Sequence, residues 1–176
     1  TVAVLRLPKG IDRMLRAMPA MLGLVPDAHY LVVGDGPARA DLEAETARLG
    51  LTGRVTFAGA RADVADMLAA ADLFALPSLT EALPTVVAEA MAAGLPVVAT
   101  RVGGTPEMVD DTTGALVEPD DPAALAWAVG GLLADPSACR ARGERARAVA
   151  VERFDLPTQA ARLAAEYRRL AAARTR

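Results

Sequence analysis

Two glutamates stand eight positions apart near the middle of the chain, Glu81 just before an expected helix and Glu89 inside it. Apolar runs at 73–76 and 97–99, on either side of this pair, predict buried strands. Glu89 is the only charged residue in the stretch 85–93, whose other residues are mostly small or apolar, as in a helix covered on most sides. Such a carboxylate needs a narrow wet stripe or a polar partner, because burying it alone is costly. Glu81 stands at the helix entrance, where free amide groups and the helix dipole favour anions.

The start of this helix decides which other interpretations remain open. Proline suits the first helical turn, so the helix is expected to begin at Pro84 and to cover 84–93. Ser78 and Glu81 have the spacing of a capping box. A helix starting there would hold Pro84 in its interior, at a cost of about 3 kcal/mol, so we discount it. Glu89, taken alone, could also be an ordinary exposed glutamate.

Composition limits the class of protein. The chain has 176 residues, 53% of them hydrophobic, which predicts one well-buried domain over 1–176. A net charge of −3 and 3% aromatic residues give no reason to expect nucleic acid. Cys139 is the single cysteine, which excludes an intrachain disulfide and favours a reducing compartment. The longest uncharged apolar run, 123–134, is too short for a transmembrane segment, and no signal peptide opens the chain, so we expect a cytoplasmic protein.

Strand-like and helix-like segments alternate along the chain. Strands are expected at 2–5, 30–33, 55–58, 73–76, 97–99 and 115–117. Helices are expected at 11–22, 37–49, 62–70, 84–93, 122–133, 137–152 and 157–172. Alternation with short loops predicts the α/β class, a doubly wound, Rossmann-like parallel sheet of about six strands with helices on both faces.

Charged residues gather where such a sheet binds ligands. Doubly wound sheets bind at the carboxyl ends of their strands, where the strand order reverses. In the usual six-strand order this point lies between the first and fourth strands. Arg6, Lys9 and Gly10 follow the first, and Glu81 follows the fourth. Two cations would then face the pair Glu81 and Glu89 across one crevice, an arrangement for a ligand with an anionic part and hydroxyl groups.

Two glycine-containing loops end at the same edge. The sequence Gly-Asp-Gly-Pro at 34–37 predicts a tight turn into a helix, with glycines that allow positive φ and close backbone approach. Gly103 and Gly104 follow the fifth strand. Their amides could form a small anion nest, and a plain turn is an equal alternative.

The sequence lacks the motifs of several common enzyme classes. No G-x-G-x-x-G follows the first strand, which argues against an NAD-dependent oxidoreductase, and no P-loop motif occurs. His29 is the only histidine, so this chain has neither a Ser-His-Asp triad nor a multi-histidine metal site. No Asp-x-Asp motif is present either. No metal site is expected.

With these residues in view, the chain resembles the C-terminal, donor-binding domain of GT-B-fold retaining glycosyltransferases of family 4, also called group 1. The resemblance covers essentially the whole chain. It rests on successive blocks in order: Arg6–Gly10, 32–37, 55–59, 77–81, 89–100, 103–104 and Gly114–Val117. Each block alone is weak evidence, but their order and the spacing of Glu81 and Glu89 are specific.

The resemblance implies roles for the site residues. Arg6 and Lys9 would hold the diphosphate of a nucleotide sugar, Glu81 would contact hydroxyls of the transferred sugar, and Glu89 would contact the ribose. Further contacts to the nucleotide sugar would come from Gly34, Gly59, Leu83, Pro84, Thr85, Gly103 and Gly104. Fixed cations and a helix N-terminus would stabilise the departing nucleoside diphosphate without a metal or other cofactor.

The chain also departs from the family pattern. Leu5 occupies a position where glycine is usual, Arg6 and Lys9 are closer together than usual, and Ala82 replaces a frequent glycine. The N-terminal acceptor-binding domain of these enzymes is absent from this chain, and the helix at 157–173 is expected to dock on it. We therefore expect half of a hexosyltransferase-like active site. The alternative is a non-catalytic nucleotide-sugar-binding or scaffold module that needs a partner domain.

Overall fold

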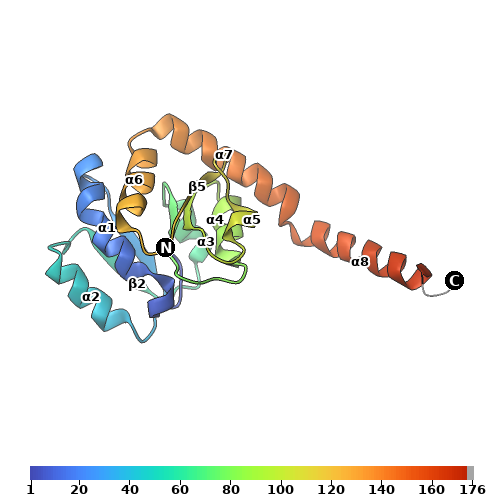
Figure 1. The fold of residues 1–176 in the computed structure, drawn as a ribbon, viewed down its shortest axis with the longest axis horizontal. Coiled ribbons are helices and arrows are strands. Elements are labelled where there is room, and N and C mark those ends of the chain that lie inside the picture. Colours follow the sequence, from blue (N-terminus) through green and yellow to red (C-terminus); the bar gives the residue numbers. More distant parts are fainter. Residues whose placement is uncertain (174–176) are drawn as a thin grey trace.

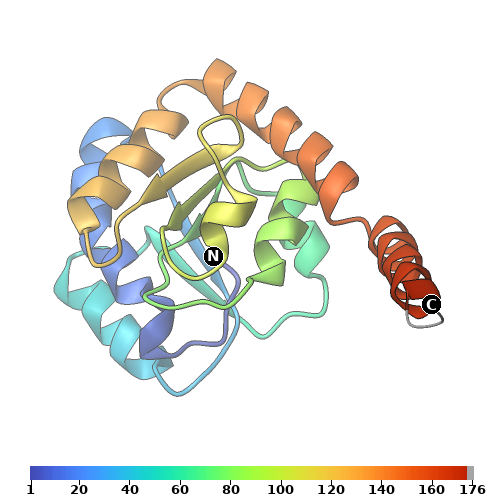
Figure 2. The same cartoon turned by 45° about the vertical axis from the view of Figure 1, so that its right-hand side comes forward.

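A computed structural model describes residues 1–173 and shows an α/β fold with five parallel strands (Figures 1 and 2). Strand β1 (Tyr30–Val33) pairs with β2 (Val55–Gly59) in one sheet. In the second sheet β4 (Val97–Thr100) lies between β3 (Phe74–Leu76) and β5 (Gly114–Val117). The predicted fold class is therefore confirmed, with five strands in place of about six.

The prediction of a strand at 2–5 is wrong. This segment has a single parallel bridge, between Val2 and Val33. The amide of Ala3 donates to the carbonyl of Val33 at 3.0 Å, so backbone pairing is made on the β1 side. Toward β3 a side chain makes the hydrogen bond: the hydroxyl of Thr1 donates to the carbonyl of Ala75 at 2.6 Å. The segment thus lies between β1 and β3, where the first strand was expected, without extending the ladder to both neighbours.

Helices follow the strands in alternation. Their bounds are η1 (Leu7–Lys9), α1 (Ile11–Leu24), α2 (Arg39–Arg48), α3 (Val64–Ala69), α4 (Thr85–Ala92), α5 (Thr105–Met108), α6 (Pro122–Leu133), α7 (Pro136–Arg153) and α8 (Leu156–Ala173). Most expected helices are confirmed to within a few residues. The sequence did not predict α5. The helix expected from Pro84 begins one residue later, with Pro84 at its N-cap.

The strands bury both faces, as a doubly wound sheet requires. Ala75 and Val98 point into a core formed with α1, α2 and α6. Phe74 and Val97, each one residue earlier, point into a second core formed with α3, α4 and α7. Figure 2 shows α1 and α6 (blue and light orange) together on one side of the strands and α4 (green) on the other. The carboxyl ends of the strands thus lie at one edge, between two well-packed helical layers.

The last helix, α8, projects away from this body and contacts chiefly α7 (Figure 1). Its exposed apolar side chains are Leu156, Leu163, Tyr167 and Leu170. At about 100° per residue these four positions fall within one narrow stripe of the helix. Over residues 1–173, no helix is both long and apolar enough for a bilayer span.

Candidate functional site

The loops after the first segment and after β3 are joined by backbone contacts. The amide of Leu79 donates to the carbonyl of Pro8 at 2.8 Å. Gly10 has a φ of +63°, and a Cβ at this position would overlap the carbonyl oxygen of Pro77. Only glycine therefore fits at this close approach. The chain thus brings the loop carrying Arg6 and Lys9 directly against the loop carrying the first glutamate.

Lys9 and Glu81 meet at this junction. The ammonium of Lys9 donates to Oε1 of Glu81 at 2.8 Å, and the hydroxyl of Ser78 donates to the same oxygen at 2.7 Å. The Glu81 side chain is only 8% exposed, while that of Lys9 is 30% exposed. Lys9 and Glu81, which the topology predicted at one edge of the sheet, are therefore in direct contact. The hydroxyl of Ser78 contacts a side chain here, and α4 begins at Thr85, so the capping box was rightly discounted.

The loop after β4 packs on the same region. The amide of Gly104 donates to the carbonyl of Ala82 at 2.6 Å. Gly103 has a φ of +52°, and a Cβ there would overlap the carbonyl of Glu81. The amide of Gly104 is thus engaged within the chain, which favours a packed turn over an anion nest at this residue.

The loop after β1 closes against the first segment. The amide of Gly34 donates to the carbonyl of Gly59 at 2.8 Å, and a Cβ on Gly34 would overlap the carbonyl of Ala3. The amide of Ala38 donates to the carbonyl of Leu5 at 3.0 Å. Gly34 and Gly59 are therefore brought together, and they permit close approach of three chain segments.

Other predicted site residues lie at the surface. Arg6 and Glu89 are exposed, and their side chains make no hydrogen bond or ion pair with another residue within 1–173. Thr85 is also exposed and precedes Glu89 by one helical turn, so both lie on the same face of α4. Leu83 is exposed and Pro84 is buried. The structure thus joins Lys9 to Glu81 but gives no contact between Glu81 and Glu89.

Sequence analysis considered Ser78 only as a possible helix cap and assigned no role to Thr100 and Thr105, which are linked to it through hydrogen bonds. Ser78, Thr100 and Thr105 are fully buried, and each is hydrogen-bonded. A usable signal was present, because Thr100 ends an otherwise apolar strand at the carboxyl edge. A polar residue at such a position needs a partner inside the protein.

A charged pair at this edge was also missed. Arg13, in the first turn of α1, donates to Asp120 in the loop after β5 at 2.8 Å. This hydrogen bond raises the pKa of Arg13, and Asp12 contributes in the same direction. Asp120 has a φ of +61°, unusual for a residue other than glycine. The pair fastens the loop after β5 to the start of α1.

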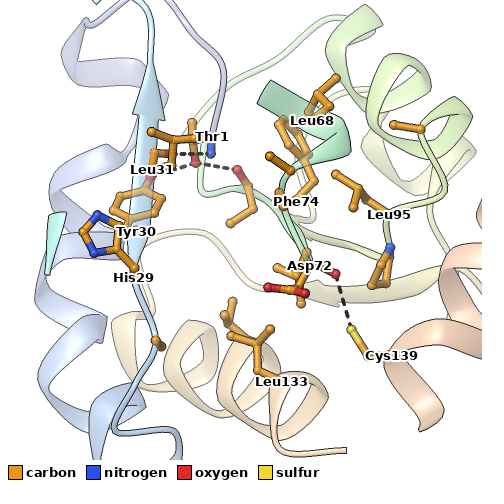
Figure 3. A pocket seen from close by; sticks show the side chains of 18 of the residues that line it. Thr1, His29, Tyr30, Leu31, Leu68, Asp72, Phe74, Leu95, Leu133 and Cys139 are labelled. Atoms are coloured by element: carbon orange, nitrogen blue, oxygen red, sulfur yellow. Dashed lines mark hydrogen bonds between the residues drawn. The ribbon is translucent and has the colours of Figure 1, made fainter. Parts of the chain in front are cut away.

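A cavity of about 860 Å³ opens at the opposite edge of the sheet (Figure 3). It is lined by residues just before the strands, among them His29, Asp72 and Pro96, and by Cys139 on α7. The thiol of Cys139 donates to the carbonyl of Asp72 at 3.4 Å, and burial raises its pKa. This cavity is therefore separate from the loops around Glu81. Among residues 1–173 no cluster of three or more His, Cys, Asp or Glu side chains could hold a metal ion.

Comparisons with known proteins agree on one family. The model for group 1 glycosyl transferases matches residues 1–135. A GDP-mannose-dependent alpha-(1-6)-phosphatidylinositol monomannoside mannosyltransferase from Mycolicibacterium smegmatis is 40% identical over 168 residues, which cover 89% of this chain and 44% of that protein.

Solved structures give the same result. The HepE protein of Anabaena in complex with UDP superposes with a TM-score of 0.87 at 32% identity, over 94% of this chain and 48% of that one. The C-terminal domain of a group 1 family protein from Francisella tularensis, LpcC, has a TM-score of 0.80 at 25% identity and is covered to 85%. The chain thus spans less than half the length of the first two proteins and most of the third. Sequence blocks, fold and these matches together show that the chain belongs to the group 1 family of glycosyltransferases and has the α/β fold of one half of a GT-B enzyme.

Proposed function

We propose that this chain is the donor-binding half of a retaining, metal-independent glycosyltransferase and that it binds a nucleoside-diphosphate sugar at the carboxyl edge of the sheet. The observation that carries the proposal is the contact of Lys9 with Glu81 at the entrance to α4, 2.8 Å between Nζ and Oε1. A cation beside a carboxylate suits a ligand that joins a diphosphate to a polyhydroxylated ring. The UDP complex of HepE, a similar structure, supports binding of a nucleotide by this fold.

In this proposal different residues bind different parts of the donor. Arg6 is exposed and Lys9 is partly exposed, so both can reach a diphosphate. Glu81 is held rigidly and suits the hydroxyls of the transferred sugar. Glu89 and Thr85, on one exposed face of α4, suit the ribose and its neighbouring phosphate. The first turn of α4 adds free amides near the leaving group. These groups stabilise charge on the departing diphosphate without requiring a metal ion.

A partner domain completes the proposed enzyme. The relatives and HepE are more than twice as long as the matched region. The apolar stripe of α8, formed by Leu156, Leu163, Tyr167 and Leu170, is exposed and suits docking on an N-terminal acceptor-binding domain. A cytoplasmic location stays a prediction from the single cysteine, Cys139.

A second candidate is a non-catalytic nucleotide-sugar-binding or scaffold module. The close spacing of Arg6 and Lys9 favours it. Arg6 is the N-cap of the short helix η1 and Lys9 is its last residue, so the loop leaves less backbone to wrap a diphosphate.

Calorimetry with UDP, GDP and ADP and with their sugar conjugates tests the proposal. We expect one nucleotide to bind, and its sugar conjugate to bind more tightly. No binding at millimolar concentration, either to this chain or to the chain joined to its N-terminal domain, would contradict the donor-site assignment. Sugar transfer distinguishes the two candidates, because a scaffold module joined to that domain would bind the donor without turnover. We expect this chain alone to transfer sugar very poorly, so robust turnover by a verified monomer would contradict the half-site model.

A further inference from the structure

Ser78 connects Glu81 to the interior of the protein. Its side chain is fully buried, and its hydroxyl donates to Oε1 of Glu81 at 2.7 Å. Its own carbonyl accepts a hydrogen bond from the hydroxyl of Thr100, which is also fully buried. Ser78 is therefore held by Thr100 at the end of β4 while its hydroxyl holds the largely buried carboxylate of Glu81.

The chain of hydroxyls continues into the loop after β4. Oγ1 of Thr105 lies 2.5 Å from the carbonyl oxygen of Thr100 and 2.8 Å from that of Val102, and it accepts the amide of Val102 at 3.1 Å. The same loop returns to the first through the amide of Gly104, which donates to Ala82. The loops after β3 and β4 are thus fastened to each other at two points around Glu81.

Lys9 and Ser78 share Oε1 of Glu81 but differ in rigidity. Lys9 is a long, partly exposed cation that the proposed function assigns to the diphosphate. Ser78 has no exposure, so its hydroxyl needs a partner inside the protein. If Lys9 turns to the diphosphate, Ser78 keeps the carboxylate oriented. Both hydrogen bonds use Oε1 of Glu81, so Oε2, which accepts no hydrogen bond from residues 1–173, stays available to a sugar hydroxyl.

We propose that Ser78 is a positioning residue that orients Glu81 for the sugar of the donor. This inference rests on the proposed function and deepens it by separating recognition of the sugar from recognition of the nucleotide. Ser78 does not touch the donor itself. Removing the Ser78 hydroxyl would therefore weaken the part of the donor affinity that comes from the sugar and leave the part that comes from the nucleotide unchanged.

The variant Ser78→Ala tests this separation by calorimetry with GDP against GDP-mannose and UDP against UDP-glucose. We expect nucleotide affinity to change by less than about twofold. The ratio of nucleotide Kd to sugar-conjugate Kd should fall about fivefold to tenfold, as for the loss of one ordinary hydrogen bond. Thr46→Val is the matched control, because Thr46 is a buried hydroxyl bonded to the carbonyl of Leu42 on α2. Equal losses for nucleotide and conjugate, or no loss for either, would overturn the inference.

A double-mutant cycle keeps the inference testable apart from the proposed function. Ser78→Ala and Glu81→Ala, singly and together, are compared by denaturant unfolding. We expect coupling of about tenfold in the unfolding equilibrium constant. Strict additivity would overturn the positioning role of Ser78. Absence of nucleotide binding by the wild-type chain, alone or joined to an N-terminal domain, would instead overturn the proposed function.

Discussion

Removing the Glu89 side chain should separate nucleotide binding from folding. Glu89 is exposed on α4, and its side chain makes no hydrogen bond or ion pair with another residue within 1–173. Truncation at such a surface position changes the free energy of unfolding by no more than about 0.5 kcal/mol. Alanine is also the better helix former, by a few tenths of a kcal/mol. Glu89→Ala should therefore fold like the wild-type chain.

The same substitution should weaken binding of the nucleotide. A carboxylate that accepts hydrogen bonds from ribose hydroxyls contributes about 1.5–3 kcal/mol. Because Glu89 is solvent-exposed, we take the lower end, which corresponds to about a tenfold rise in Kd. Calorimetry with UDP, GDP and ADP measures this, and thermal unfolding of the same samples reports the fold.

Two controls make the result specific. Glu144→Ala removes an exposed glutamate from α7, on another face of the molecule, and should leave Kd unchanged. A nucleotide analogue without ribose hydroxyls should bind Glu89→Ala and the wild-type chain equally. An unchanged Kd for the natural nucleotide, or loss of the fold in Glu89→Ala, would refute the assignment of Glu89 to the ribose.

Three further predictions concern stability. Gly131→Ala on α6 meets no atom within 4 Å and should raise the free energy of unfolding by up to about 1 kcal/mol. A Cβ on Gly143 of α7 would overlap the carbonyl of Gly94, so Gly143→Ala should lower the free energy of unfolding by about 2–3 kcal/mol. Denaturant unfolding of the two alanine variants and the wild-type chain tests whether the first is stabilised and the second destabilised. Hydrogen bonding to Arg48 is the main cause that lowers the pKa of Glu45 to about 2, below its ordinary 4.5. The stability that this pairing contributes is present above pH 4.5 and is lost as the pH falls toward 2. The melting temperature of Glu45→Gln should therefore depend less on pH in that interval than that of the wild-type chain. The same pH dependence of melting temperature in both proteins would contradict this.

Sequence alone predicted the elements whose ends carry strong local signals. Strand β1 was predicted at its observed bounds, Tyr30–Val33, because it is uniformly apolar and followed by Gly34. Helix α6 was likewise predicted exactly, since Pro122 at its start is preceded by Asp121, whose carboxylate accepts the amide of Ala124 at 2.9 Å. Helix α5 was missed because four residues are too few for a periodic pattern.

The candidate site was predictable in its location and less so in its contacts. Topology alone placed Lys9 and Glu81 at one edge, because the carboxyl ends of parallel strands share an edge. The hydrogen bond from Ser78 could not be derived, since it depends on side-chain rotamers and on how tightly two loops pack. The same spacing of Ser78 and Glu81 also suggested a capping box, which a local pattern cannot distinguish from a side-chain pair. The strand at 2–5 failed because a pattern of apolar residues does not reveal whether both neighbours are close enough to pair.

The packing of α1 on α6 has a consequence for synthesis of the chain. The two helices pack extensively on each other, yet about a hundred residues separate the end of one from the start of the other. At the ribosome's pace of about 5–20 residues per second, that separation corresponds to about 5–20 s. During this interval the nascent chain carries the apolar face of α1, with Met14, Met18 and Met21, before its partner exists. The methionine face of α1 therefore lacks the cover that α6 provides until α6 has been synthesised.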